Sequence, residues 1–191
     1  EAMQSITFAE GSRLTAFDDY VFQNCTALKQ ITLPAGVTSV HWSVFSGCTA
    51  LTDIFVEEGS TTLKDIDGVL YTADGTTLLL YPISKDDTAF TTPAGVTTIG
   101  ETAFYNCTGL TSLTIPDSVK SIGNSAFSRC SALTSVSIPQ GVTTIVNYTF
   151  DGCSGLTSVT IPQSVTSIGS DAFNGCSGLT SVTIPQSVTK I

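Results

Sequence analysis

A repeat of 23 residues constrains the fold of this chain more than any other feature. The unit LTSVTIPQSVTSIGSDAFNGCSG begins at Leu156, and the same opening letters return 23 residues later. Copies begin at Leu28, Leu51, Leu110, Leu133, Leu156 and Leu179. A looser first copy spans 6–27, and the copy from Leu51 is interrupted by an insertion and resumes at Phe90. Because self-similarity at a fixed spacing is typical of stacked repeats, the sequence predicts about eight rungs, the last of them half a rung.

Each rung has the same internal pattern of apolar residues. In the copy from Leu156, the apolar side chains of Val159 and Ile161 alternate with Ser158 and Thr160. This period of two predicts a half-buried strand, which Pro162 ends because proline cannot donate a ladder hydrogen bond. A second inward pair, Val165 and Ile168, predicts a short strand or 3-10 segment, and the spacing of Ala172, Phe173 and Cys176 predicts a short helical turn.

One rung cannot fold alone, because about eight apolar side chains bury too little surface to offset the ordering of 23 residues. Stacking supplies the rest, since each rung covers the open face of the next. The expected architecture is therefore a β-rich α/β solenoid, right-handed, with a parallel sheet on one face and short strands and helical turns on the other. The expected domain is a single solenoid over residues 1–191.

The repeated letters L-x-x-V/L-x-I-P-x-x-V-x-x-I-G-x-x-A-F-x-x-C resemble the BspA-type (Treponema-like) class of leucine-rich repeats, over nearly the whole chain. This resemblance implies a leucine-rich-repeat solenoid from a bacterial or protozoan surface or secreted protein. Proteins of this class are often implicated in adhesion to host proteins. The resemblance carries no catalytic residues over to this chain.

The insertion, residues 57–88, has a hairpin signal of its own. The segments VLYT from Val69 and TLLLY from Thr77 flank Asp74-Gly75. Asp-Gly between two apolar runs favours a tight turn between antiparallel strands. An isolated hairpin is marginal in water, so we expect one face to pack on the solenoid and the other to stay available, with Tyr71 and Tyr81 as candidate contacts.

The positions of the cysteine, histidine and carboxylate residues argue against a catalytic site or a metal site. All six cysteines occupy one slot of the rung: Cys25, Cys48, Cys107, Cys130, Cys153 and Cys176. Side chains in one column point the same way, so we expect buried free thiols rather than disulfides or zinc ligands. The single histidine, His41, occupies a slot that holds glycine in other rungs, which favours a turn residue over a general base. Asp65, Asp67 and Asp74 are too few for calcium, which takes six to eight oxygens. We expect no enzyme activity, no cofactor and no metal.

The charge balance excludes two classes of partner. Seven Lys+Arg against 16 Asp+Glu give a net charge of −9, so the chain lacks the basic stripe that a nucleic-acid binder needs. No apolar run approaches the roughly 20 residues of a membrane-spanning helix, so we expect no membrane insertion. Serine and threonine, 54 of 191 residues, must supply most of the polar surface.

Departures from the repeat mark the candidate binding surface. The third rung places Asp53 and Phe55 at outward strand positions, followed by Glu57, whereas the later rungs place serine or threonine there. Trp42 is one of four aromatic residues that replace polar residues on the turn side, with Tyr20, Tyr105 and Tyr148. Exposed aromatic residues are enriched in interface hot spots. We therefore expect Asp53, Phe55, Glu57 and Trp42, with the two hairpin tyrosines, to contact a partner.

The expected function is that of a non-catalytic protein-binding module, of the adhesion type, on a cell surface or outside the cell. Its expected partner is another protein, such as a host extracellular-matrix or surface protein. Two alternatives stay open. One is a structural spacer or stalk, favoured by the uniform hydroxyl columns of the last rungs, and the other is a carbohydrate-binding module built around Tyr71, Tyr81 and Asp74. The uncapped C-terminal rung adds an expected end-to-end self-association.

Overall fold

The computed structural model describes residues 3–191, and these fall into two compact units, 1–85 and 86–191. The boundary between the units lies inside the expected insertion. Apart from one 3-10 turn, η1 (Trp42–Phe45), the regular structure is β. Within the described residues, no helix is long and apolar enough to cross a membrane.

The first unit contains two small sheets. Strands β1 (Gln30–Leu33) and β2 (Asp53–Val56) pair in parallel, with Ile31 opposite Ile54 and Thr32 opposite Phe55. Strands β3 (Leu63–Ile66), β4 (Val69–Thr72) and β5 (Thr77–Leu80) pair antiparallel. The β4–β5 hairpin turns at Asp74-Gly75 as predicted, and Gly75 has a positive φ of 74°. A second hairpin, β3–β4, turns at Asp67-Gly68, an Asp-Gly pair whose turn signal our sequence analysis overlooked.

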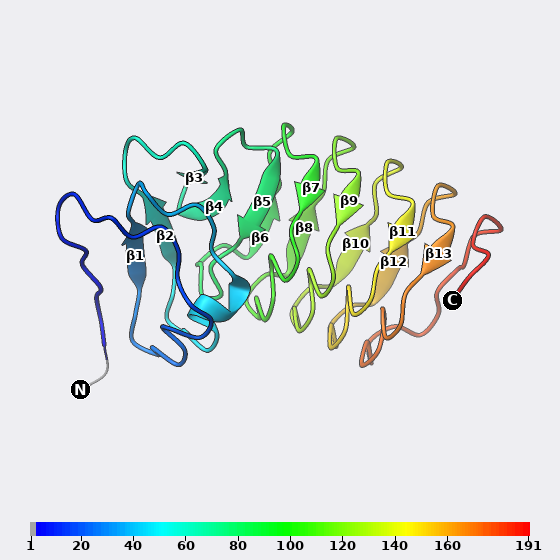
Figure 1. Ribbon diagram of the computed structural model, residues 1–191. Coiled ribbons are helices and arrows are strands. Elements are labelled where there is room, and N and C mark those ends of the chain that lie inside the picture. Colours follow the sequence, from blue (N-terminus) through cyan, green and yellow to red (C-terminus); the bar gives the residue numbers. More distant parts are fainter. Residues whose placement is uncertain (1–2) are drawn as a thin grey trace. The chain divides into compact units, whose positions relative to one another are not determined.

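The second unit repeats a regular rung (Figure 1). Strands β6 (Ala89–Thr91), β8 (Ser112–Thr114), β10 (Ser135–Ser137) and β12 (Ser158–Thr160) form one parallel sheet in the order β12-β10-β8-β6. The second inward pairs form shorter parallel strands: β7 (Thr98–Ile99) with β9 (Ser121–Ile122), and β11 (Thr144–Ile145) with β13 (Ser167–Ile168). Both strand predictions within a rung are therefore confirmed.

The solenoid fold class is confirmed, but the predicted number of rungs is too high. Within residues 3–191, two rungs of the first unit and four of the second carry a strand in the leading column. The first copy, 6–27, forms turns and irregular backbone, and the last half-copy contributes only the bridge between Ser167 and Lys190. The two parts of the interrupted copy carry β2 and β6 and count as two rungs, so the first copy and the last half-copy account for the difference from eight.

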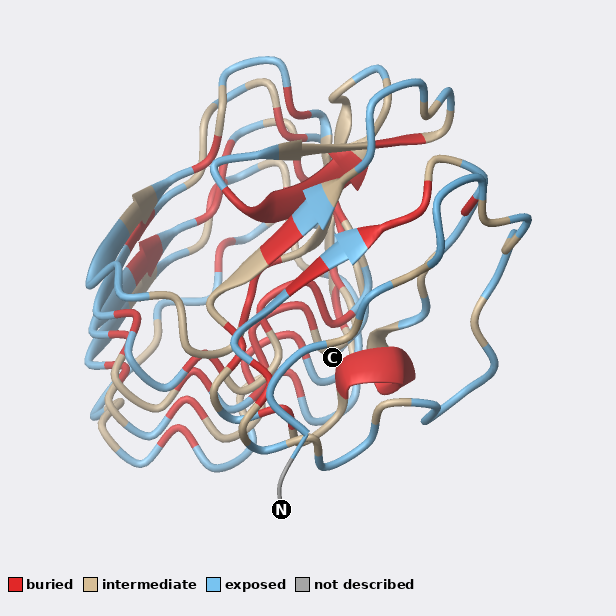
Figure 2. Ribbon diagram, turned by 90° about the vertical axis from the view of Figure 1, so that its left-hand side faces the viewer, coloured by how far each residue is buried: buried red, intermediate tan, exposed pale blue. Residues whose placement is uncertain are grey.

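The expected helical turns form in one rung only. Segment Ser170–Cys176 is a series of tight turns in which Asp171 and Gly175 have φ values of 55° and 68°. Left-handed residues interrupt a helix, so the apolar side chains of this segment reach the core from turns instead. The exception is η1, which appears in Figure 2 as a short helical ribbon in the colour of buried residues.

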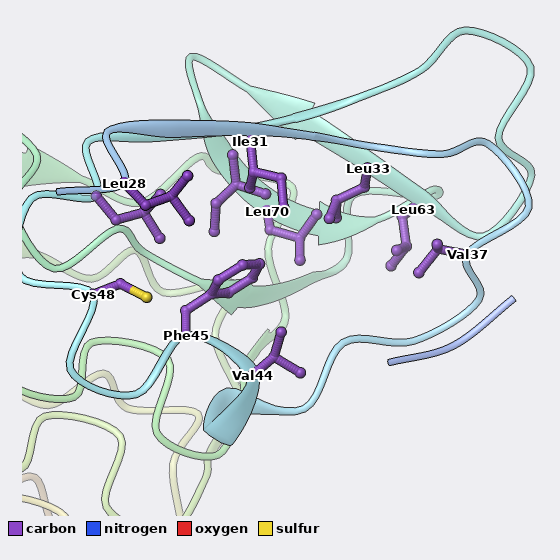
Figure 3. Close-up of a cluster of buried hydrophobic side chains, with 11 residues drawn as sticks. Leu28, Ile31, Leu33, Val37, Val44, Phe45, Cys48, Leu63 and Leu70 are labelled. Atoms are coloured by element: carbon purple, nitrogen blue, oxygen red, sulfur yellow. The ribbon is translucent and has the colours of Figure 1, made fainter. Parts of the chain in front are cut away.

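Each unit has an apolar core of its own. In the first unit, Leu28, Ile31 and Leu33 meet Val44 and Phe45 of the η1 turn, and Leu70 of β4 closes the cluster (Figure 3). In the second unit, rings at the same slot of consecutive rungs stack with centroids 5.4 to 5.5 Å apart: Phe104, Phe127, Phe150 and Phe173. Ring pairs at this distance add to the stabilisation from apolar burial.

Hydroxyl groups join successive rungs. The Oγ1 atoms of Thr111, Thr134 and Thr157 each donate to a backbone carbonyl 23 residues earlier, at distances of 2.8 to 3.1 Å. Ser118, Ser164 and Ser187 make a parallel series to carbonyls 22 residues earlier. Some of the exposed serine and threonine side chains therefore also link one rung to the next.

Candidate partner-binding surface

The outward face of β1 and β2 carries two of the predicted contact residues. Because side chains alternate along a strand, Ile31 and Ile54 enter the core while Thr32 and Phe55 face outward. The Phe55 side chain remains 36% exposed although it is large and apolar. A phenyl ring held on the outward face of a paired sheet can contact a partner without any change of backbone.

Asp53 lies on the same face but is engaged within the chain. Its Oδ1 atom lies 3.1 Å from Nζ of Lys85, and its Oδ2 atom accepts a hydrogen bond of 2.8 Å from the Thr52 hydroxyl. The side chains of Lys85 and Asp53 are only 15% and 29% exposed. This geometry gives Asp53 a part in fixing the end of the insertion onto β2.

Glu57 is exposed and follows β2 directly. Its Oε2 atom accepts a hydrogen bond of 3.1 Å from the Ala35 amide, which holds the side chain against the preceding rung. Glu57 also lines a hollow of about 270 Å³ between residues 5–8 and β1. A second hollow of about 590 Å³, lined by Lys29 and Thr52 among others, shares Ser5 and Gln30 with the first. The surface beside this sheet is therefore hollowed on both sides of Gln30.

The two hairpin tyrosines are not available to a partner, which corrects the sequence prediction. Tyr71 and Tyr81 are 1% and 4% exposed. Burial, with a smaller contribution from the charge of Asp67, raises the pKa of Tyr71 to about 12. Val69, Leu70 and Tyr71 are consecutive residues of β4 and all are buried, so both faces of this strand are covered. The face of the hairpin that was expected to stay free is covered.

The carboxylates of the insertion serve local structure. Asp65 Oδ1 accepts a hydrogen bond of 2.9 Å from the Val56 amide. Asp74 Oδ1 accepts one of 2.6 Å from the Thr72 hydroxyl and two from Thr76, and these bonds lower the pKa of Asp74. Residues 3–191 hold no group of three or more His, Cys, Asp or Glu side chains placed to bind a metal ion.

Trp42 forms part of an aromatic cluster that was not predicted from the sequence. Its ring lies 6.3 Å from that of Tyr20 in an edge-to-face arrangement, and 5.5 Å from the imidazole of His41. The sequence signal was present, because Tyr20 and Trp42 are separated by 22 residues and so occupy adjoining slots of consecutive rungs. Tyr105 instead receives the Arg129 guanidinium at 5.6 Å from its ring.

Asp19, His41 and Ser43 meet beneath this cluster. Asp19 Oδ1 accepts a hydrogen bond of 2.9 Å from the Ser43 hydroxyl and lies 2.9 Å from Nδ1 of His41. The arrangement differs from a catalytic triad, in which the serine hydroxyl bonds Nε2 of the histidine. Here the buried Ser43 hydroxyl donates to the carboxylate, and its oxygen also lies 2.7 Å from Nδ1 of His41, not Nε2. Ser43 therefore positions both Asp19 and His41.

The cysteine column is structural. The Sγ atoms of Cys48, Cys130, Cys153 and Cys176 each donate to the backbone carbonyl of a phenylalanine 26 residues earlier, at 3.0 to 3.1 Å. Burial raises the pKa of the Cys48 and Cys176 thiols to about 11. A hydrogen bond with Cys107, together with burial, raises the pKa of Cys130. Groups that stay protonated in this way are poor nucleophiles.

Comparison with known proteins places these features in a family. The family model of the BspA-type leucine-rich repeat region matches residues 1–67 and 84–191 in six copies. The chain belongs to this family. Six is also the number of described rungs that carry a leading strand.

Solved structures of a bacterial vaccine antigen and of leucine-rich repeat proteins are similar to this chain. The pneumococcal vaccine antigen PcpA is 29% identical with a TM-score of 0.86, over 95% of this chain and 45% of that one. A leucine-rich cell surface protein of Faecalibacterium prausnitzii is 38% identical with a TM-score of 0.63, over 80% and 47%. A leucine-rich repeat protein of Eubacterium ventriosum is 25% identical with a TM-score of 0.64, over 92% and 59%. The chain thus spans about half the length of these relatives. Among curated proteins, none matches the sequence at a significant level.

Proposed function

We propose that this BspA-type chain is a non-catalytic binding module of a bacterial surface or secreted protein, and that it contacts a protein partner through the outward face of β1 and β2. The observation that carries the proposal is the exposed ring of Phe55 at a position that holds threonine or serine in β1, β6, β8, β10 and β12. Glu57 and the two hollows beside Gln30 supply the rim of the surface.

Charge favours the kind of partner. The first unit carries ten Asp+Glu against four Lys+Arg. An acidic surface accelerates association with a basic patch and makes it sensitive to salt. The surface location is supported by the names of two similar proteins, a vaccine antigen and a cell surface protein. Host extracellular-matrix proteins are the partners to test first.

The test is binding to an immobilised panel of extracellular-matrix proteins and glycans, at low and at physiological salt, by biolayer interferometry. Phe55→Thr copies the residue opposite it in β1 and should weaken a protein hit at least about tenfold. Thr114→Ser, at the corresponding outward position of β8, is the matched control. Unchanged affinity in Phe55→Thr would remove the sheet face from the proposal, and binding to glycans alone would replace the protein partner with a carbohydrate.

A spacer role is the second candidate, and the second unit favours it. The outward side chains of β8, β10 and β12 are serine or threonine, and all of them are exposed. Such a face is well solvated and offers no hot spot. Absence of binding to every protein and glycan of the panel would favour the spacer role.

A further inference from the structure

The turn side of the first unit carries an aromatic corner, formed by Tyr20, which is exposed, and Trp42, which is half-buried. The two rings stand nearly perpendicular, at 84°, and the Tyr20 side chain is 48% exposed. Trp42 begins the η1 turn, and the core cluster separates this turn from β1 (Figure 3). The aromatic corner is thus a different surface from the sheet face around Phe55.

A carboxylate stands beside the aromatic corner and is held in place. Asp19 precedes Tyr20 in the chain, and its side chain is 63% exposed. Both of its described contacts, from Ser43 and His41, end on Oδ1. None of the described contacts of this side chain ends on Oδ2. Asp18 adds a second exposed negative charge next to it.

We propose that Tyr20, Trp42 and Asp19 form a receptor for the guanidinium group of an arginine in a basic segment of a partner polypeptide. A cation within about 6 Å of an aromatic face is attracted by the ring, and tryptophan and tyrosine are the stronger faces. The planar guanidinium stacks on such rings and bonds a carboxylate at the same time, which the compact lysine ammonium does less well. The negative charge of the first unit favours the same ligand, whereas a neutral sugar would gain nothing from it.

The repeat supplies matched substitutions for the test. In later rungs the slot of Tyr20 holds Ser125 at a φ of 53°, close to the 61° of Tyr20, so Tyr20→Ser replaces the ring with a residue the backbone already accepts. The slot of Asp19 holds asparagine at 124 and 147, so Asp19→Asn removes the charge and keeps an acceptor. Tyr148 occupies the Tyr20 slot of another rung and is 45% exposed, which makes Tyr148→Ser the control.

The fluorescence of Trp42, the single tryptophan, reports on the aromatic corner directly. The probe is a blocked pentapeptide with two arginines, compared at 150 mM salt with the same peptide carrying neutral citrulline. We expect a saturable change of emission with the arginine peptide only. Tyr20→Ser and Asp19→Asn should weaken binding at least about fivefold, while Tyr148→Ser and Phe55→Thr should change it less than about twofold.

Several results would overturn the proposal. The first is equal binding of the citrulline and arginine peptides. The second is the absence of a saturable fluorescence response, if calorimetry also detects no binding. The third is an equal loss of affinity in Tyr20→Ser and Tyr148→Ser. A response to maltotriose or N-acetyllactosamine in place of the arginine peptide would assign the aromatic corner to glycans. Because Phe55 is not part of this surface, failure here leaves the proposed function of the sheet face standing, and loss of panel binding in Phe55→Thr leaves the arginine receptor standing.

Discussion

At the scale of single residues, Thr92 is a buried polar group without a partner. Its side chain is 1% exposed, and its Oγ1 atom is, among the described residues, the one buried side-chain oxygen or nitrogen without a hydrogen bond. The corresponding slot holds Ile138 or Ile161 in later rungs. Burying a hydroxyl without a hydrogen bond costs about 1–3 kcal/mol.

We therefore predict that Thr92→Val raises the free energy of unfolding by about 1 kcal/mol, because valine has nearly the same shape and no hydroxyl. Urea denaturation measures the change. The control is Thr149→Val, since Thr149 is equally buried but donates to the Val146 carbonyl at 2.7 Å. That variant should lose about 1 kcal/mol. A gain in both variants would show that valine acts through something other than the missing hydrogen bond.

The raised thiol pKa values of Cys48 and Cys176 predict a dependence of stability on pH. In the unfolded chain these thiols titrate near their ordinary value of 9.0, and in the folded chain at about 11. Between these values the folded state binds more protons than the unfolded state, so the free energy of unfolding should fall as pH rises from 9 to 11. Urea denaturation across that range measures the fall, and Cys176→Ala should make it shallower. Identical pH profiles for the two proteins would contradict the prediction.

At the scale of elements, the β3–β4 turn depends on Gly68. This residue has a φ of 74°, and a Cβ added to it would collide with the Asp53 carboxylate that pairs with Lys85. Gly59 has a φ of 90° and open space around it, so the two glycines separate backbone strain from crowding.

We predict that Gly59→Ala lowers the free energy of unfolding by about 1 kcal/mol, the cost of a positive φ in a residue with a Cβ. Gly68→Ala should cost about 2–3 kcal/mol, because a clash with Asp53 adds to the same strain. Chemical denaturation of both variants checks the difference. Equal losses would mean that the Asp53 side chain moves aside at no cost.

The turn elements show where sequence reasoning reached its limit. The period of two predicted β8, β10 and β12 correctly, since alternation alone determines which side chains a strand buries. The same kind of spacing at Ala172, Phe173 and Cys176 suggested a helix, but turns with left-handed residues place the same side chains inward. Spacing reports which residues are buried and not the backbone path between them.

The candidate surface divides in the same way. Phe55 was predictable because one strand position determines its direction. The burial of Tyr71 and Tyr81 was not, because it depends on what covers both faces of the hairpin, which the residues of the hairpin alone do not indicate. The meeting of Tyr20 with Trp42 required two rungs to be placed side by side.

At the scale of the whole molecule, one sequence forms a strand in one rung and none in another. Residues 156–166 and 179–189 have the same sequence, LTSVTIPQSVT. The first copy forms β12 beside β10, whereas the second forms no strand and leaves Ile184 41% exposed. Strand pairing with the adjacent rung, rather than local preference, is what differs.

We predict that hydrogen exchange distinguishes the two identical segments. Amides of β12 that bond to β10 should exchange at least about tenfold more slowly than the matching amides of residues 181–183, because paired amides must open before they exchange. Mass spectrometry of peptides that include the unequal flanking residues resolves the two copies. Equal rates would show that the second copy pairs in solution as the first does.

The hydroxyl series between rungs has a consequence for how such a chain can change in length. Each threonine finds its acceptor at a fixed distance back along the chain, and the acceptor is a main-chain carbonyl that every residue possesses. These hydrogen bonds between two rungs therefore do not depend on the sequence of the neighbouring rung. Duplicating or deleting one 23-residue segment of the second unit would leave these hydrogen bonds between the remaining rungs intact. The second unit can therefore grow or shrink by whole rungs, while the surfaces at Phe55 and at Tyr20, which belong to the first unit, stay unchanged.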